Sequence, residues 1–147
     1  MRAVVDTQEL VRMVTTRGGS GLYQAWRAGD FLLVMSEMQF AELSEVLSRP
    51  QLARYVRAGD AEALYVALRE ASYWVSPSDG PGLCRDPNDE YLLAQAIAGQ
   101  ADFLVSSDKD LYDDAILVRV MKEQYRVRVV MPEKFLAILA NQSRRIY

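Results

Sequence analysis

Short runs of apolar residues recur along this chain, and longer stretches in which apolar residues repeat at helical spacing separate many of them. Apolar runs of this length are typical of strands that are buried on both faces of a sheet. Strands that alternate with helices form a mainly parallel sheet with helices on both faces. We therefore predict an α/β fold, one domain over residues 1–147, with a short five-stranded sheet whose strands lie at residues 3–5, 31–35, 73–75, 103–105 and 127–130.

Capping signals mark where two of the helices begin. Ser36 and Gln39 form a capping-box pair, which predicts a helix to about residue 48 that Pro50 ends. Asp86 followed by Pro87 predicts another start, because aspartate is a favoured N-cap and proline a favoured first helical residue. Further helices are predicted from residue 22, over 61–72 and over 132–140, whereas residues 113–126 are ambiguous between a helix and a pair of strands.

The composition excludes several kinds of chemistry. The chain has no histidine, which rules out Ser-His-Asp and Cys-His catalysis and zinc sites built on imidazole. Cys84 is the only cysteine and cannot form an internal disulfide, so we expect a cytoplasmic protein. No apolar run approaches the roughly 20 residues that cross a bilayer, and no signal peptide is recognisable, so we expect no membrane association. The net charge of −3 is unlike that of a nucleic-acid-binding protein, unless a metal ion neutralises acidic residues.

Four carboxylates stand out because of their positions. Asp6 directly follows the first predicted strand and Asp108 follows the fourth, so both are expected at the carboxyl edge of the sheet, where α/β folds bind ligands. Asp89 lies in the first turn of its predicted helix, on the face of the apolar residues that follow, so its charge needs a partner. Glu42 lies at the margin of an apolar helix stripe. Together these residues offer the hard oxygen ligands that magnesium and manganese prefer.

Purely structural interpretations compete with these roles. Asp6, Asp86 and Asp108 also fit helix N-caps or turns, and Glu42 also fits a solvated helix position. Four basic residues close to them in sequence either contact phosphate or are ordinary surface charges: Arg12, Arg17, Arg85 and Lys109. The Gly-rich residues 18–21 lack both the lysine of a P-loop and the spacing of a dinucleotide fingerprint, so we predict a loop there.

A series of short motifs runs from the first predicted strand to the last helix. The motifs are Asp6-Thr7, Ala41-Glu42-Leu43, Arg85-Asp86-Pro87-Asn88-Asp89 with Leu92-Leu93-Ala94, residues 101–111 and residues 132–136. In this order and spacing they resemble the PIN-domain family, and most closely the toxins of bacterial and archaeal toxin–antitoxin pairs. The resemblance implies a parallel five-stranded sheet and an endoribonuclease that needs Mg²⁺ or Mn²⁺ to hydrolyse RNA phosphodiester bonds.

The same resemblance assigns roles to individual residues. It places the catalytic, metal-binding acids of the family at Asp6, Glu42, Asp89 and Asp108. It implies accessory roles for Asp86, Ser106 and Gln8. Ser106 corresponds to a small hydroxyl residue that fixes a metal-bound water, whereas Gln8 stands where the family usually has asparagine.

Partners and alternatives follow from the resemblance as well. It implies an RNA substrate, an antitoxin protein and a homodimer, and we expect the apolar helices around residues 43–47 and 64–68 to offer the antitoxin a groove. The alternative is a catalytically weakened PIN domain that binds RNA or protein, and Gln8 is its support. A phosphatase that uses Asp6 as its acceptor fits less well, because such enzymes have a second aspartate where this chain has Gln8.

Overall fold

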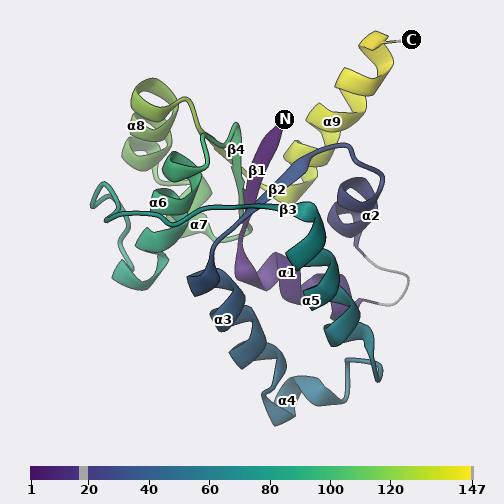
Figure 1. Cartoon of the computed structure of the whole chain (residues 1–147). Helices are drawn as coiled ribbons and strands as arrows, with labels where there is room; N and C mark the ends of the chain where they lie inside the picture. Colours follow the sequence, from purple (N-terminus) through teal and green to yellow (C-terminus); the bar gives the residue numbers. More distant parts are fainter. Residues whose placement is uncertain (17–19, 147) are drawn as a thin grey trace.

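The computed structural model describes residues 1–16 and 20–146, and Figure 1 shows a central sheet between two groups of helices. Within these residues the sheet has five strands in the order β3-β2-β1-β4-β5, and every pair is parallel. The strands are β1 (Arg2–Val5), β2 (Leu32–Met35), β3 (Ser72–Trp74), β4 (Phe103–Val105) and β5 (Arg128–Val130). The predicted α/β fold and five-stranded sheet are confirmed, and the sheet is wholly parallel.

The first strand of the sequence lies at the centre of the sheet. Ala3 is in register with Leu33 of β2 on one side and with Phe103 of β4 on the other. Val5 lies opposite Val105, and the next residue still belongs to the ladder, since the Asp6 N–H donates to the Val105 carbonyl at 2.9 Å. The segments that follow β1 and β4 therefore leave the same edge of the sheet side by side.

Two groups of helices cover the two faces of the sheet. One group consists of α1 (Thr7–Thr15), α2 (Gly21–Arg27), α3 (Glu37–Leu47), α5 (Asp60–Ala71) and α9 (Pro132–Ile146). The other consists of α6 (Glu90–Ala98), α7 (Lys109–Tyr112) and α8 (Ala115–Tyr125). The alternation of side chains along β1 serves both groups, because Ala3 and Val5 face the first and Val4 faces the second. The short helix α4 (Pro50–Ala53) follows α3, and the 3-10 turn η1 (Pro87–Asp89) leads into α6.

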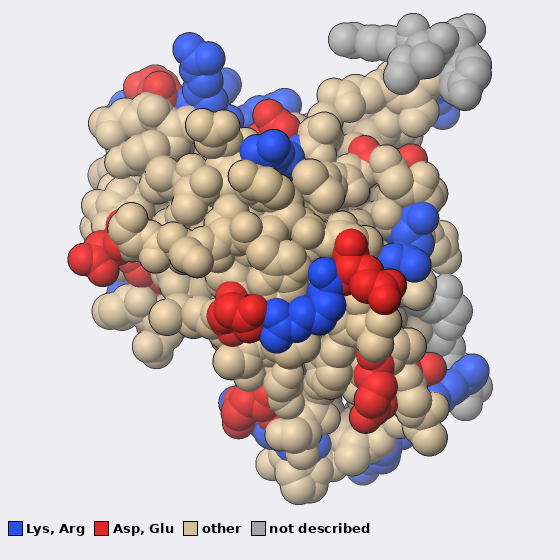
Figure 2. Space-filling view, in the orientation of Figure 1, with Lys and Arg blue, Asp and Glu red and all other residues tan. Residues whose placement is uncertain are grey.

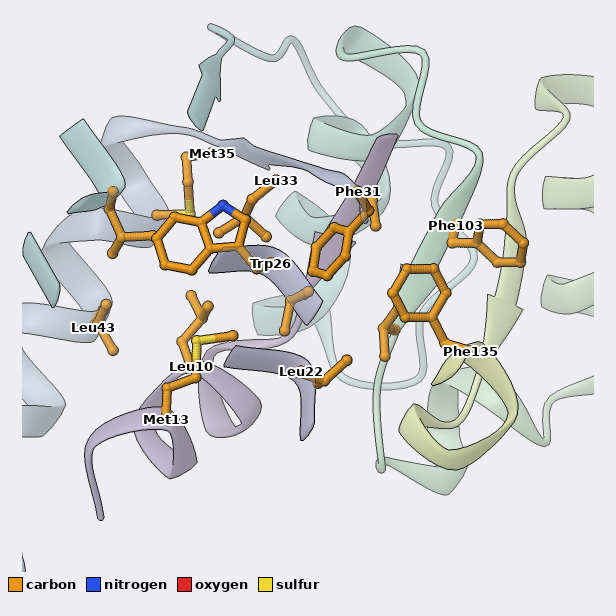
Figure 3. Close-up of a cluster of buried hydrophobic side chains, with 14 of the residues drawn as sticks. Leu10, Met13, Leu22, Trp26, Phe31, Leu33, Met35, Leu43, Phe103 and Phe135 are labelled. Carbon is orange, nitrogen blue, oxygen red and sulfur yellow. The ribbon is translucent and has the colours of Figure 1, made fainter. Parts of the chain in front are cut away.

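Aromatic side chains anchor the last helix on the sheet. Phe135 of α9 packs between Phe31 and Phe103, and its ring centroid lies 5.1 Å from the centroid of each (Figure 3). Trp26 of α2 closes the same core and is 4% exposed. Burying a phenylalanine contributes roughly 1.5–3 kcal/mol, so Phe135 helps to hold the N-terminal half of α9 on the sheet.

The leucines of α3 and α5 belong to this core. Leu43, Leu47, Leu64 and Leu68 are all at most 7% exposed. These leucine side chains are packed in the core, so they are not themselves free to bind a partner. The groove expected around residues 43–47 and 64–68 stays a prediction.

Several predicted boundaries differ from the structure. Pro50 is the first residue of α4, where its missing N–H is not needed, whereas α3 already ends at Leu47. Residues 115–125 form α8, because Leu117 and Met121 lie one helical turn apart and are both buried against the sheet. The last helix runs to Ile146 instead of residue 140, and its end projects beyond the sheet (Figure 1).

Residues 18 and 19 of the Gly-rich patch lie outside the described residues. Nowhere in residues 1–16 and 20–146 is a helix both long and apolar enough to span a membrane.

Candidate active site

A cavity of about 730 Å³ opens where β1 and β4 end. Its walls come from the segments after β1 and β4, from α1 and α3, and from η1. The lining residues include the four acids that the sequence singles out, namely Asp6, Glu42, Asp89 and Asp108. Residues that are up to 102 positions apart therefore contribute carboxylates to one space.

Asp6 is fixed by the segment that follows β4. Its Oδ2 accepts a hydrogen bond of 2.6 Å from the hydroxyl of Ser106, which is fully buried. The same hydroxyl accepts from the backbone N–H of Asp108 at 3.0 Å. Ser106 thus connects two of the acids directly. The other oxygen of Asp6 accepts from the Gln8 N–H at 3.5 Å and caps α1, so the capping interpretation of Asp6 is correct as well.

Asp108 and Asp86 also cap helices, but they differ in where they lie. Oδ1 of Asp108 accepts from the Asp110 N–H at 2.9 Å at the start of α7, and Asp108 lines the cavity. Oδ1 of Asp86 accepts from the Asn88 N–H at 2.9 Å at the start of η1, and Asp86 is not among the lining residues. The structural interpretation therefore accounts for Asp86 more completely than for Asp108.

The surroundings of Asp89 raise the pKa of its carboxyl group. Partial burial, followed by the negative charges of Asp6, Asp86, Asp108 and Glu42, raises the pKa of Asp89 from 3.8 to about 6. Asp89 lies in η1 and directly precedes α6, so it is not the third residue of an α-helix as the sequence predicts. Burial is the larger cause of the raised pKa and the negative charges of the other acids add to it, and a bound cation would offset both.

The donor set fits a hard divalent cation. All four acids offer carboxylate oxygens, which suit Mg²⁺ and Mn²⁺, and no sulfur or imidazole ligand lines the cavity. Among the described residues, no three Asp, Glu or Cys side chains are close enough together to form a ready-made metal cage. Mg²⁺ usually keeps several waters and takes only one or two carboxylates from a protein, so it does not require such a cage.

Glu42 is exposed, but a tyrosine fixes its position. The hydroxyl of Tyr91 donates to Oε2 of Glu42 and lies 3.1 Å from Oγ1 of Thr7 on its other side. Burial and the contact with Glu42 raise the pKa of Tyr91, so this hydroxyl keeps its proton. Thr7 is buried at the end of β1, and it thereby connects the carboxylate of Glu42 to the sheet.

Two buried glutamines, Gln39 and Gln95, connect α3 and α6 to the ends of β1 and β2. Nε2 of Gln39 donates to the carbonyl of Val5 at 2.6 Å, and Nε2 of Gln95 donates to Oε1 of Gln39 at 2.6 Å and to the carbonyl of Val34 at 3.0 Å. Ser36 caps α3 through the Gln39 N–H at 3.2 Å, as predicted. The Gln39 side chain does not return to the Ser36 N–H, however, because its Oε1 accepts from Gln95 and its Nε2 donates to the end of β1. The pattern Ser36–Gln39 is therefore only half of a capping box.

A fifth carboxylate lies near the cavity and is not apparent from the sequence. Glu9 of α1 has a side chain that is only 6% exposed, and its Oε1 accepts from Nη1 of Arg12 at 2.8 Å and from the Ser107 hydroxyl at 2.5 Å. The spacing of Glu9 and Arg12 predicts an ordinary surface ion pair, and the burial of Glu9 depends on Ser107, which is 98 positions away in the sequence.

Basic side chains at the cavity come from three segments. Arg12, Arg49 and Lys109 line it together with the acids. Arg85 instead lies 3.7 Å from Asp110 in an exposed ion pair outside the lining, and Arg17 lies outside the described residues. Figure 2 shows Lys and Arg interspersed with Asp and Glu, without a large area of one sign on the face that it presents. Any attraction for a polyanion on this face must therefore be local.

A family model described as PIN domain matches residues 2–110. This range contains β1 to β4 and the four acids that line the cavity. Comparison with curated proteins and with solved structures gave no match.

Proposed function

We propose that this chain, which belongs to the PIN domain family of nucleases, is a divalent-metal-dependent endoribonuclease. The observation that supports the proposal best is the convergence of four carboxylates on one cavity at the carboxyl edge of a parallel sheet. Partial burial and the neighbouring negative charges, which raise the pKa of Asp89 to about 6, are consistent with a cation at the same place. The preference for RNA rests on the resemblance of the motifs to toxin ribonucleases.

In this proposal Asp6, Asp89 and Asp108 supply the direct carboxylate ligands of one or two metal ions, and Glu42 binds a metal or orients its water. A bound Mg²⁺ or Mn²⁺ supplies an activated water at neutral pH and stabilises negative charge on the phosphate. Ser106 keeps Asp6 in place through its 2.6 Å hydrogen bond.

The proposed biological role is that of the toxin in a toxin–antitoxin pair, with an antitoxin protein and a homodimer as its assemblies. A toxic ribonuclease requires an inhibitor. Co-expression with the neighbouring gene and purification through a tag on this chain tests this role. A second protein that copurifies and suppresses cleavage supports it, and a clean monomer that cleaves RNA freely contradicts it.

Cleavage of single-stranded RNA tests the activity. We expect cleavage with Mg²⁺ or Mn²⁺, no cleavage with EDTA, and loss of most activity in Asp6→Asn and Asp89→Asn, because each substitution removes a charged ligand. Asp79→Asn is the matched control, since Asp79 is exposed and does not line the cavity. Unchanged cleavage by Asp6→Asn or by Asp89→Asn contradicts the assignment. Metal binding without cleavage by the wild type favours the alternative, a weakened PIN domain that acts as a binding module.

A further inference from the structure

Glu9, Arg12 and Ser107 form a cluster that the proposed metal site does not use. Glu9 is buried in α1, and its carboxylate is satisfied by Arg12 and by Ser107. Arg12 is 54% exposed and lines the acidic cavity, and its Nη1 also lies 3.4 Å from the Ser107 hydroxyl. The cluster thus joins α1 to the segment that carries Asp108.

Stability alone does not account for a buried carboxylate that is paired with a half-exposed arginine. Removing a carboxylate from water is costly, and apolar residues of similar volume are often as stable or more stable in its place. The structure shows a different consequence of the burial of Glu9. Nη1 of Arg12 is held by two partners, whereas Nε and Nη2 have no hydrogen-bond partner among the described residues and the side chain, which lines the cavity, is 54% exposed.

The other two basic side chains at the cavity are placed differently. Arg49 donates to both oxygens of Glu45, at 3.1 and 2.7 Å, so its fork is already occupied by a carboxylate. Lys109 is a point charge on a flexible stem. Arg12 combines a fixed position with free donors, and Ser107 holds it next to Asp108.

We propose that Arg12 binds a phosphate of the RNA strand, and that Glu9 and Ser107 are the residues that position it. This inference rests on the proposed function, because it assigns a phosphodiester subsite beside the metal-binding acids. Guanidinium groups bind phosphate through two parallel N–H donors. Since Glu9 offsets the charge of Arg12, the subsite acts through directed hydrogen bonds more than through long-range attraction.

The test measures RNA binding separately from cleavage. Fluorescence anisotropy with a labelled single-stranded RNA is recorded in Mg²⁺ in the Asp6→Asn background, in which the strand stays intact. Arg12→Ala is expected to weaken binding about tenfold, and Arg12→Lys restores little, because charge-assisted bidentate bonds require the fork. Arg54→Ala is the control, since Arg54 is exposed and does not line the cavity.

A double-mutant cycle tests the positioning. Ser107→Ala changes no charge and is expected to weaken binding about threefold, with no added loss when Arg12→Ala is already present. Mn²⁺ affinity, measured by calorimetry on the otherwise wild-type chain, stays unchanged in both single variants. Equal RNA binding by wild-type Arg12 and Arg12→Ala overturns the inference, and so does the absence of RNA binding in this background. If the wild-type chain shows this Arg12-dependent binding but does not cleave, the proposed hydrolysis fails and the subsite stands.

Discussion

Replacing Asp89 with asparagine is expected to stabilise the metal-free protein at neutral pH. The pKa of Asp89 is raised from 3.8 to about 6, first by partial burial and then by the neighbouring carboxylates. Between these two values the folded protein binds the proton more tightly than the unfolded chain does. The contribution of Asp89 to stability is therefore complete below pH 3.8 and is lost as the pH rises through 6.

The size of the effect follows from the shift and from the exposure of the side chain. The free energy that corresponds to the whole pKa shift is an upper limit. The actual effect is smaller, because Asp89 is only partly buried and solvent screens the charges of its neighbours. We expect a gain of about 1 kcal/mol for Asp89→Asn at pH 7. For a chain of this length, that gain raises Tm by roughly 2–4 °C.

Thermal unfolding from pH 4 to pH 8, in EDTA and in Mg²⁺, tests this reasoning. In EDTA the Tm of the variant rises relative to that of the wild type as the pH passes from 4 to 7. Mg²⁺ then stabilises the wild type more than Asp89→Asn, because the cation relieves a repulsion that the variant no longer has. A lower Tm for Asp89→Asn at pH 7 in EDTA refutes the picture of crowded carboxylates.

Three further substitutions address the fold and the cavity. Gly99→Ala is expected to cost about 1–3 kcal/mol in urea unfolding, because a Cβ there lies 2.5 Å from Cγ1 of Val34, and an unchanged midpoint contradicts the tight packing. Tyr91→Phe is expected to weaken Mn²⁺ binding several-fold in calorimetry, because it releases Glu42. No further loss of Mn²⁺ affinity is expected when Glu42→Gln is already present. An equal loss with and without Glu42→Gln assigns Tyr91 a general structural role. Gln8→Asn is expected to raise the RNA cleavage rate by about tenfold without changing metal affinity, because the shorter amide is held more firmly. A lower cleavage rate in the variant shows that Gln8 is adapted to this site.

The sequence predicts the layers of the fold better than its details. Apolar runs reveal β1 and β4, because strands buried on both faces admit little else. The contact between Ser107 and Glu9 cannot be predicted from the sequence, because no motif around either residue indicates that the two lie together. Gln39 illustrates a different difficulty. Its spacing from Ser36 fits a capping box, and only the fold shows that its Nε2 donates to the carbonyl of Val5 while its Oε1 accepts from Gln95.

The competing interpretations of the acids were not true alternatives. Asp6 accepts the capping hydrogen bond with one oxygen and the Ser106 hydrogen bond with the other. Asp108 caps α7 and also lines the cavity. A carboxylate has two oxygens and several lone pairs, so one side chain can end a strand, begin a helix and face a ligand at once. Sequence patterns predict the capping role, and only the fold shows that these acids line one cavity.

The central place of β1 in the sheet has a consequence for how the chain is made. A ribosome releases β1 first, and β2 can pair with one of its edges as soon as residue 35 has emerged. The other edge of β1 stays unpaired until β4 has been synthesised. The hydrogen bond between Asp6 and Ser106 likewise joins residues that are 100 positions apart. Nascent chains that stop short of residue 106 thus expose an unpaired edge of β1 and hold an incomplete set of carboxylates. The cavity is therefore assembled only after residues 106–108 have been synthesised.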